Sequence, residues 1–275
     1  MSLGLAIAII VVCTTVSVTL MLVVRRRAPD GSYFADGDRA AGVFGVIATG
    51  FFLLMGFVVF LAFTSYDSAR AGAEDEARIV AQQVETAQLF PEANRADLTA
   101  ELICYARSVA GVQWDRMENH TLGDDLNPWG VKMFETLQQV DAKTNAEQDA
   151  YSRWGDERTA REDARSARIH GAAGVIPTPL WLVLFFAAIT IVVYMLFFAD
   201  RGERALVQGV LMGSVVAVIV SMLLLLQFLN NPFHAGVGGL RPVAMERTLR
   251  IIDQEMIRVA GLQITLPCDE RGNER

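Results

Sequence analysis

AAGVFGVIATGFFLLMGFVVFLAFTSYDSARAGA, residues Ala40–Ala73, is the stretch that decides how this chain folds. It begins with an uncharged apolar run of 24 residues, Ala40–Phe63, and about 20 such residues are enough to cross a bilayer as a helix. The sequence then passes through Thr64–Asp67 into a charged region without a proline. The stretch therefore predicts one long helix that leaves the membrane and becomes the first helix of a soluble domain.

Three further apolar runs have the same character. They are Leu3–Val24, Ile176–Ala199 and Ala205–Leu229, and like the first run they contain no Asp, Glu, Lys, Arg or His. A spanning segment must satisfy its backbone hydrogen bonds internally, so each run is predicted to be a helix. Ala, Glu, Gln and Arg dominate the polar regions and favour helices there as well. The sequence predicts an all-α protein with four transmembrane helices.

The order of apolar and polar stretches divides the chain into four parts. We expect transmembrane helices 1 and 2 in residues 1–63, a helical soluble domain in 64–175, and transmembrane helices 3 and 4 in 176–229. Residues 230–275 form a C-terminal tail, whose predicted amphipathic helix needs a partner for its apolar face. We expect this tail to pack on the soluble domain.

Apolar spacing predicts which faces of the soluble helices are buried. One apolar stripe is predicted in the first helix of the soluble domain and another in the tail helix. In both, the apolar residues recur at intervals that alternate between four and three. Their residues are Leu98, Leu102, Tyr105, Val109 and Val112, and Met245, Leu249, Ile252, Met256 and Val259. A helix opened by Pro128 is expected to carry Phe134, Leu137 and Val140 on one face, whereas Lys143–Arg168 is polar on every side.

Arginines in the short connections predict the orientation in the membrane. Arg25, Arg26 and Arg27 follow the first run, and Arg201 and Arg204 lie between the third and fourth runs. Positively charged loops stay in the cytoplasm, so the N-terminus, the soluble domain and the C-terminus are expected to face outward from the plasma membrane. A cleaved signal peptide carries its charge before its apolar core, so the first run is predicted to be a retained span.

Charge and motif content exclude several classes of function. The formal net charge is −7, and residues 64–174 hold 20 Asp and Glu against 12 Lys and Arg, which argues against a nucleic-acid partner. No catalytic or phosphate-loop motif occurs, so we expect neither an enzyme nor a cofactor. The spans lack the ionisable residues that proton-coupled carriers use, which leaves a passive pore or a structural subunit.

Two cysteines, Cys104 and Cys268, lie in polar segments separated by two predicted spans, hence on the same side of the membrane. If that side is oxidising, they can form a disulfide; the alternative is two unrelated thiols. Cys13 lies inside the first apolar run, where a small packing or lipid-facing residue is expected. No CxxC pair or Cys–His cluster occurs, so no metal site is predicted.

One face of the second span carries Thr49, Leu53 and Phe57, which are spaced four residues apart. Gly45 and Gly56 flank them and allow close approach of another helix. One interpretation is a pore-lining stripe in an oligomer. The alternative is a face that contacts lipid or packs inside the protein, because every apolar span has such a face.

Four arginines fall on one predicted helical face shortly before the chain re-enters the membrane: Arg158, Arg161, Arg165 and Arg168. One interpretation is a positive ring that attracts anions to a pore mouth. Glu157 precedes Arg161 by four residues and Glu162 follows Arg158 by four. A self-neutralised, solvent-exposed face is therefore the alternative.

Several short motifs occur in a fixed order along nearly the whole chain. They are Gly56-Phe57, Ser65–Arg70 followed by Glu74 and Glu76, Gln113-Trp114, Pro179–Trp181 and Asn231–Phe233. With the layout of two spans, a helical domain, two spans and a helical tail, they resemble the bacterial bestrophin-like domain family. The resemblance implies the properties of the bestrophins, which are pentameric anion channels gated by an apolar neck on the second span. By this resemblance, Thr49, Leu53 and Phe57 match the neck positions.

The chain departs from that resemblance in two ways. Bestrophins carry an acidic calcium-binding run just after Asn-Pro-Phe, whereas this chain has His234–Gly238 there, so calcium gating is not implied. Bestrophins also hold their large domain in the cytoplasm, opposite to the orientation that the arginine loops predict here.

These observations lead to two hypotheses. The first is an oligomeric, bestrophin-like membrane protein that acts as a passive anion channel, with the second span lining the pore. The alternative is a non-catalytic accessory or scaffold subunit, which binds a larger membrane complex through its outward-facing helical domain. Both hypotheses expect the lipid bilayer and further membrane subunits as partners.

Overall fold

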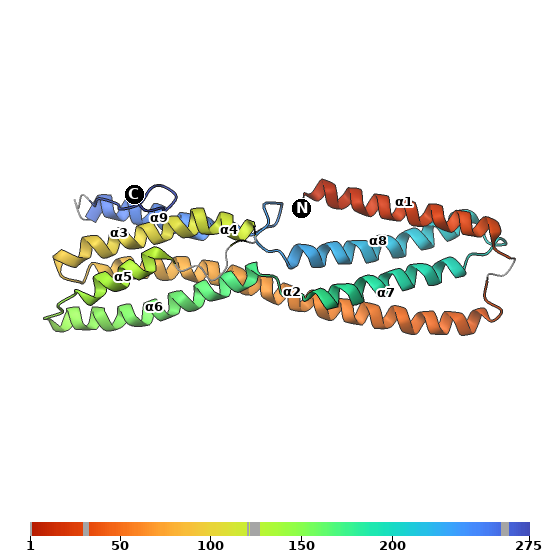
Figure 1. The fold of residues 1–275 in the computed structure, drawn as a ribbon, viewed down its shortest axis with the longest axis horizontal. Helices are drawn as coiled ribbons and strands as arrows, with labels where there is room; N and C mark the ends of the chain where they lie inside the picture. Colours follow the sequence, from red (N-terminus) through yellow and green to blue (C-terminus); the bar gives the residue numbers. More distant parts are fainter. Residues whose placement is uncertain (1, 30–32, 120, 122–126, 260–263) are drawn as a thin grey trace. The chain divides into compact units, whose positions relative to one another are not determined.

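The structure, a computed structural model, describes residues 2–29, 33–119, 121, 127–259 and 264–275, and only the backbone of residues 255–259. Helices make up most of these residues (Figure 1). They are α1 (Leu3–Arg27), α2 (Gly37–Ala87), α3 (Glu92–Ser108), the π-helical segment η1 (Val109–Gln113), α4 (Trp114–Glu118), α5 (Pro128–Gln138), α6 (Asn145–Ala172), α7 (Thr178–Phe197), α8 (Ala205–Leu229) and α9 (Val243–Val259).

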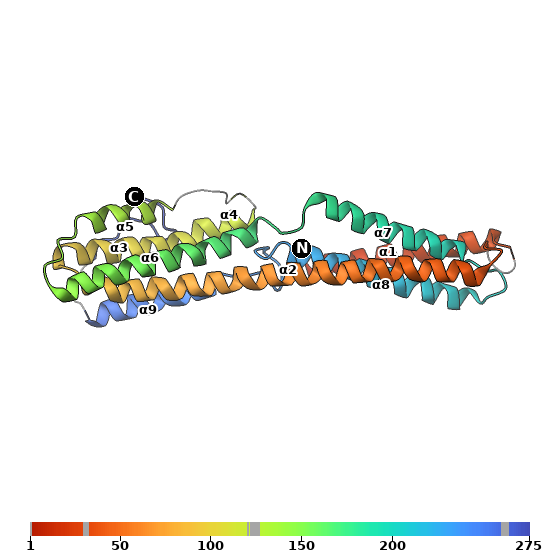
Figure 2. The same cartoon turned by 90° about the horizontal axis from the view of Figure 1, so that it is seen from below.

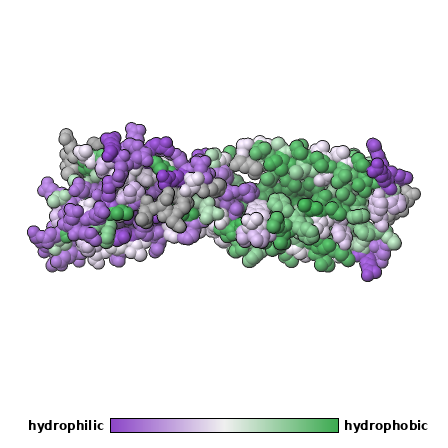
Figure 3. Space-filling model, viewed as in Figure 1, coloured by the Kyte–Doolittle hydropathy of each residue, from purple (hydrophilic) through white to green (hydrophobic). Residues whose placement is uncertain are grey.

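The chain divides into two compact units, each built from two segments. We call Met1–Ser65 with Val175–Asn230 the membrane unit, and Tyr66–Gly174 with Asn231–Arg275 the polar unit. On the face shown in Figure 3, the membrane unit is mostly apolar and the polar unit mostly hydrophilic. The membrane unit therefore suits lipid, and the polar unit suits water.

Four helices, α1, α2, α7 and α8, are long and apolar enough to cross a membrane. Many of their large apolar side chains are exposed, an arrangement that is stable in lipid and unfavourable in water. The predicted all-α fold with four membrane spans is confirmed.

α2 is a single helix of 51 residues that contributes to both units. It continues through Thr64–Asp67, as the absence of a proline predicted. In its first part Phe51, Met55, Val58 and Ala62 are buried, and their alternating spacing of four and three keeps them on one face. The prediction of one helix across the end of the apolar run is confirmed.

Close packing of α1 on α8 depends on two glycines of α8. A Cβ atom at Gly213 would lie 3.3 Å from side-chain carbons of Thr14 and Val18, and one at Gly209 would lie 3.5 Å from Val18. Small residues four apart let membrane helices approach closely, so that dispersion contacts hold the pair together.

The two short connections that carry arginines meet at one end of the membrane unit. The Arg25 guanidinium donates to the carbonyl oxygens of Arg201, at 3.0 Å, and of Glu203. Arg201 donates in turn to the carbonyl oxygen of Arg26. The last turn of α1 and the segment between α7 and α8 are thereby joined to each other.

The core of the polar unit contains apolar residues from α2, α3, α5, α6, α9 and the C-terminal segment. Trp129, Trp154 and Tyr105 are among its largest fully buried side chains. α6 runs alongside α2 (Figure 2). A Cβ atom at Gly72 would lie only 2.7 Å from the carbonyl oxygen of Ala164, so this close approach of the two helices requires glycine.

A π-helical turn interrupts the predicted stripe of the first soluble helix. Leu98, Leu102, Tyr105 and Val109 are at most 1% exposed. α3 then ends at Ser108, and η1 leads into α4. The extra residue of a π-turn shifts the helical register. Gln113, the last residue of η1, and Trp114, the first of α4, are both buried. Apolar spacing does not reveal such a shift.

The buried face of α5 includes the predicted Leu137 but not the predicted Phe134. Trp129, Met133 and Leu137 are buried at four-residue intervals, whereas Phe134 is 40% exposed. The Phe134 ring is covered in part by the guanidinium of Arg158, 4.5 Å from its centroid. Trp129 and Met133 share a helical face with Leu137, and that face turns toward the core.

The predicted stripe of the tail helix contacts the core of the polar unit. Met245 and Ile252 of α9 are buried in that core, and Leu249 packs against it. The side chains of Met256 and Val259 lie outside the described residues.

Candidate functional site

Thr49, Leu53 and Phe57 lie on the face of α2 that is turned away from the rest of the membrane unit. Leu53 is 71% exposed and Phe57 60% exposed, and Thr49 is exposed as well. This face lies opposite the buried residues Phe51 and Met55, because residues two positions apart on a helix point in nearly opposite directions. The three side chains are therefore free to contact lipid or a second protein molecule.

The glycines of this part of α2 have no packing role within the single chain. A Cβ atom added at Gly42, Gly45, Gly50 or Gly56 would meet no atom of the described chain within 4 Å. This differs from Gly213 of α8, which α1 contacts closely. A close helix approach at Gly45 and Gly56 would therefore involve another molecule.

The polar unit contains a buried ion pair between α2 and α6. Arg168 donates from Nε to Glu76 Oε2 at 2.5 Å and from Nη2 to Oε1 at 3.1 Å, and both side chains are fully buried. The Tyr105 hydroxyl donates to Glu76 Oε1 at 2.6 Å, and Gln113 Oε1 accepts from Arg168 Nη2 at 3.2 Å. The carboxylate and the guanidinium thus compensate each other in a region without water access.

The protonation states of this cluster follow from burial and charge. Burial raises the pKa of Tyr105 well above its usual value, and the neighbouring Glu76 carboxylate raises it further. Burial lowers the pKa of Arg168, but the charge of Glu76 outweighs that effect and the net pKa is raised. Tyr105 therefore stays a neutral hydrogen-bond donor and Arg168 stays charged.

A second buried arginine lies one heptad earlier on α6. Arg161 is 1% exposed, donates to Gln83 Oε1 at 2.7 Å, and places its guanidinium 4.6 Å from the centre of the Tyr105 ring. Its nearest carboxylate is that of Glu162, at 3.4 Å. A neutral amide, an aromatic face and a half-exposed carboxylate together hold this cation.

The arginine face of α6 differs from both interpretations of the sequence. Arg161 and Arg168 are buried, Arg165 is half-buried with Glu162 at 3.8 Å, and Arg158 covers the Phe134 ring. Two of the four side chains are thus unavailable to a solvent-exposed ring around a pore mouth. The physical reason is that the neighbouring helices supply buried partners for them.

Cys104 of α3 and Cys268 of the C-terminal segment form a disulfide, with 5.8 Å between their Cα atoms. The last residues are held in place around this bond. Trp129 Nε1 donates to the carbonyl oxygen of Gly272 at 2.7 Å, and Gly272 has a φ of 81°, a conformation that favours glycine. Cys13 is a free, partly exposed thiol.

Glu101 of α3 is a buried carboxyl group that lacks full hydrogen bonding. It is 9% exposed. Oε1 accepts from the Thr136 hydroxyl at 2.8 Å, but Oε2 is buried without a partner among the described residues. Burial raises its pKa to about 7, and the Asp97 carboxylate nearby adds to this effect.

We expect Glu101→Gln to stabilise the polar unit at pH 8 but to leave it nearly unchanged at pH 5. Since the folded pKa of Glu101 exceeds the unfolded value of 4.5, folding favours the protonated carboxyl, and wild-type stability falls as pH rises from 4.5 through about 7. The difference between the two pKa values corresponds to about 3 kcal/mol. Thermal unfolding at the two pH values measures it, with Glu92→Gln, an exposed position on the same helix, as the control; a stability difference that does not change with pH would contradict the assignment.

The buried partners Glu76, Gln83 and Gln113 were not among the predicted site residues. A signal for two of them was present: Glu76 and Gln83 are seven residues apart on α2, and Arg161 and Arg168 are seven apart on α6. Two polar pairs at the same heptad spacing can meet across an antiparallel helix pair. Gln113 had no such signal, because it lies in the π-helical segment, which sets its direction.

Known proteins similar to this chain include one matching family and several solved structures. The family described as "Bestrophin-like domain" matches residues 8–244. A point mutant of a bacterial bestrophin homolog from Klebsiella pneumoniae shares the fold at a TM-score of 0.68 and 10% identity, over 92% of this chain and 99% of its own. A crystal structure of a membrane protein gives 0.68 at 12% identity, over 89% and 98%. No curated protein matches the chain.

Proposed function

The chain belongs to the bestrophin-like family, and we propose that it is a homo-oligomeric, passive anion channel whose pore is lined by α2. Its likeness to a bacterial bestrophin homolog concerns the fold, since only 10% of the residues are identical. The single observation that carries the proposal is the exposed face of α2 with Thr49, Leu53 and Phe57.

Three properties of this face support a pore rather than lipid contact alone. It includes a polar hydroxyl at Thr49, which water or an ion can contact. The glycines at positions 45 and 56 leave room for a helix of another subunit. The apolar run Ala40–Phe63 carries no ionisable side chain, as suits passive conduction without proton coupling.

Phe57 is the residue that we assign to the constriction. A ring of large apolar side chains around a pore axis excludes water and blocks ions. Truncation of Phe57 would widen and wet this constriction, and the side chain makes no ring contact among the described residues that its removal would disturb.

We expect Phe57→Ala to raise chloride flux in proteoliposomes by about tenfold or more, which corresponds to a barrier lowered by about 1.4 kcal/mol. Flux is measured as chloride efflux under an imposed potential. The matched control is Phe186→Ala, an aromatic residue of α7 that is 73% exposed and outside the proposed pore. Absence of flux in all three proteins across several lipids and pH values would remove the channel proposal.

Oligomeric state distinguishes the channel from an accessory or scaffold subunit. A closed ring in which α2 surrounds the axis supports the channel, because a heterologous interface that closes leaves a central path. A monomer, or a two-fold dimer without an axial path, supports the accessory subunit. Mass measurement of the detergent-solubilised protein separates these outcomes.

We also propose that the N-terminus, the polar unit and the C-terminus face the outside of the cell. The basis is the concentration of arginines in the two short connections. The disulfide between Cys104 and Cys268 supports this orientation, since such bonds persist in oxidising compartments. Free thiols at both positions, in protein alkylated within intact cells before lysis, would reverse the orientation.

A further inference from the structure

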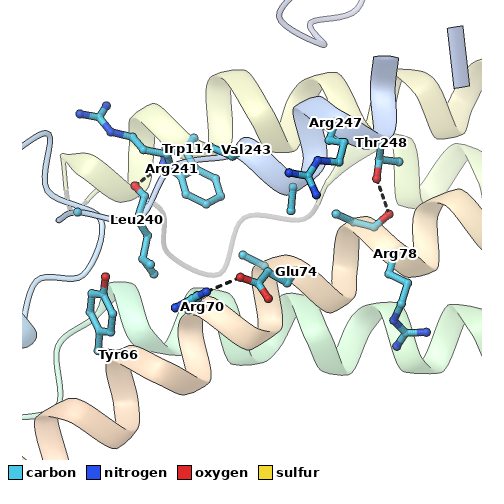
Figure 4. Close-up of a pocket in the computed structure, with 14 residues that line it drawn as sticks. Tyr66, Arg70, Glu74, Arg78, Trp114, Leu240, Arg241, Val243, Arg247 and Thr248 are labelled. Atoms are coloured by element: carbon cyan, nitrogen blue, oxygen red, sulfur yellow. Dashed lines mark hydrogen bonds and ion pairs between the residues drawn. The ribbon is translucent and has the colours of Figure 1, made fainter. Parts of the chain in front are cut away.

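A cavity of about 570 Å³ lies within the polar unit, between α2, α9 and the segment that precedes α9. Figure 4 shows Arg70 and Glu74 on one wall, Arg247 on the opposite wall and Leu240 at one end. Nε1 of the buried Trp114 donates to the carbonyl oxygen of Leu240 at 3.4 Å, which fixes that end. The volume lies within the range of about 300–1,000 Å³ that is typical of small-molecule sites.

The charge of this cavity is opposite to that of the chain. Four arginines and one glutamate line it, whereas the chain carries a net charge of −7. Two of these arginines are held by other groups. Arg78 pairs with Asp75 at 3.1 Å and points away from the cavity in Figure 4, and Arg241 donates to the carbonyl oxygen of Ala235 at 2.7 Å.

The other two arginines face the open space from opposite walls. Arg247 points into the cavity in Figure 4 and makes no hydrogen bond or ion pair with any described residue. Arg70 pairs with Glu74 at 3.0 Å, and both of these side chains are more than half exposed. Such an exposed pair is weak, so a ligand anion can replace Glu74 as the partner of Arg70.

We propose that this cavity binds a phosphate-bearing amphiphile. The phosphate lies between Arg247 and Arg70, because the planar guanidinium donates two parallel hydrogen bonds to phosphate oxygens. The apolar part lies on Leu240 and Val243, which line the same cavity. Val243 is also the first residue of α9, whose N-terminal partial positive charge adds to the attraction.

The ligand can be the headgroup of an anionic phospholipid or a soluble phosphate ester, and the experiment separates the two. Purified full-length protein is titrated in one arm with inorganic phosphate and pyrophosphate in detergent. In the other arm it binds vesicles of phosphatidylcholine with or without phosphatidic acid. Binding that depends on phosphatidic acid identifies a lipid headgroup, and binding of the free anions alone identifies a soluble ligand.

Two substitutions with opposite expected effects on the binding affinity make the test specific. Arg247→Gln weakens binding by at least about tenfold, which corresponds to about 1.4 kcal/mol. Glu74→Gln strengthens it, because the change releases Arg70 and removes a negative charge from the site. Arg250→Gln, three residues further along α9 and exposed, is the matched control and leaves the affinity unchanged.

Equal losses in Arg247→Gln and Arg250→Gln would show a non-specific effect of charge and overturn the proposal. So would the absence of binding in both arms at low ionic strength. The readout is binding and needs no ion flux, so its result is independent of the channel proposal.

Discussion

Replacing Arg168 by methionine lowers the free energy of unfolding of the polar unit by about 3–5 kcal/mol. The substitution removes a guanidinium that contacts Glu76 at 2.5 and 3.1 Å. It leaves the Glu76 carboxylate fully buried, with the Tyr105 hydroxyl as its remaining hydrogen-bond donor among the described residues. An uncompensated buried charge costs far more than the pair contributes.

Urea unfolding followed by tryptophan fluorescence measures this loss. Trp114, Trp129 and Trp154, three of the four tryptophans, lie in the polar unit, so the signal reports mainly on that unit. Arg153→Met, an exposed position on the same helix, is expected to change stability by no more than about 0.5 kcal/mol.

A double-mutant cycle with Glu76→Gln identifies the cause. Removing the carboxylate and the guanidinium together leaves no unpaired charge in the core, so the double variant is expected to be less destabilised than the sum of the single variants. Strictly additive losses would mean that Arg168 acts through its packing and not through its pairing with Glu76.

Loss of the disulfide between Cys104 and Cys268 is the second large effect that we expect. The bond closes a loop with a sequence separation of 164 residues, for which the chain-entropy relation gives an upper estimate of about 5 kcal/mol. Cys104→Ala with Cys268→Ala should therefore destabilise the polar unit by about 2–5 kcal/mol.

The same unfolding titration measures this change, with Cys13→Ala, the remaining cysteine, as the control. The wild-type protein treated with a reducing agent should unfold like the double variant. Trp129 fluorescence gives a local readout, because its indole donates to Gly272 in the segment that the disulfide holds. Unchanged stability after verified reduction would show that the hydrogen bonds of the C-terminal residues hold this segment without the bond.

The sequence predicts the membrane spans well, because lipid imposes a strong and local constraint. Each span must be a continuous apolar helix, and that requirement is readable residue by residue. The continuity of α2 through Thr64–Asp67 follows from the same local logic, since nothing in that segment ends a helix. Helix type and extent are therefore predictable here from neighbouring residues alone.

The polar unit is harder to predict, because its burial depends on contacts between distant residues. Arg161 and Arg168 look like surface residues in a polar helix, and only Gln83 and Glu76 on α2 make their burial possible. Burial of Gln113 depends on a π-turn that no apolar spacing signals. The face of α2 with Thr49, Leu53 and Phe57 was predictable as one helical face, because their four-residue spacing alone places them together.

The polar unit takes Met245, Ile252 and Cys268 into its core from residues that follow the last span. During synthesis, residues 66–174 leave the ribosome before α7, α8 and these core residues exist. The apolar surfaces of residues 66–174 therefore lack these packing partners while α7 and α8 are synthesised, at about 5–20 residues per second, and enter the bilayer. The core of this unit is therefore completed only once residues 245–268 have been made, and until then its exposed apolar residues are open to aggregation and proteolysis.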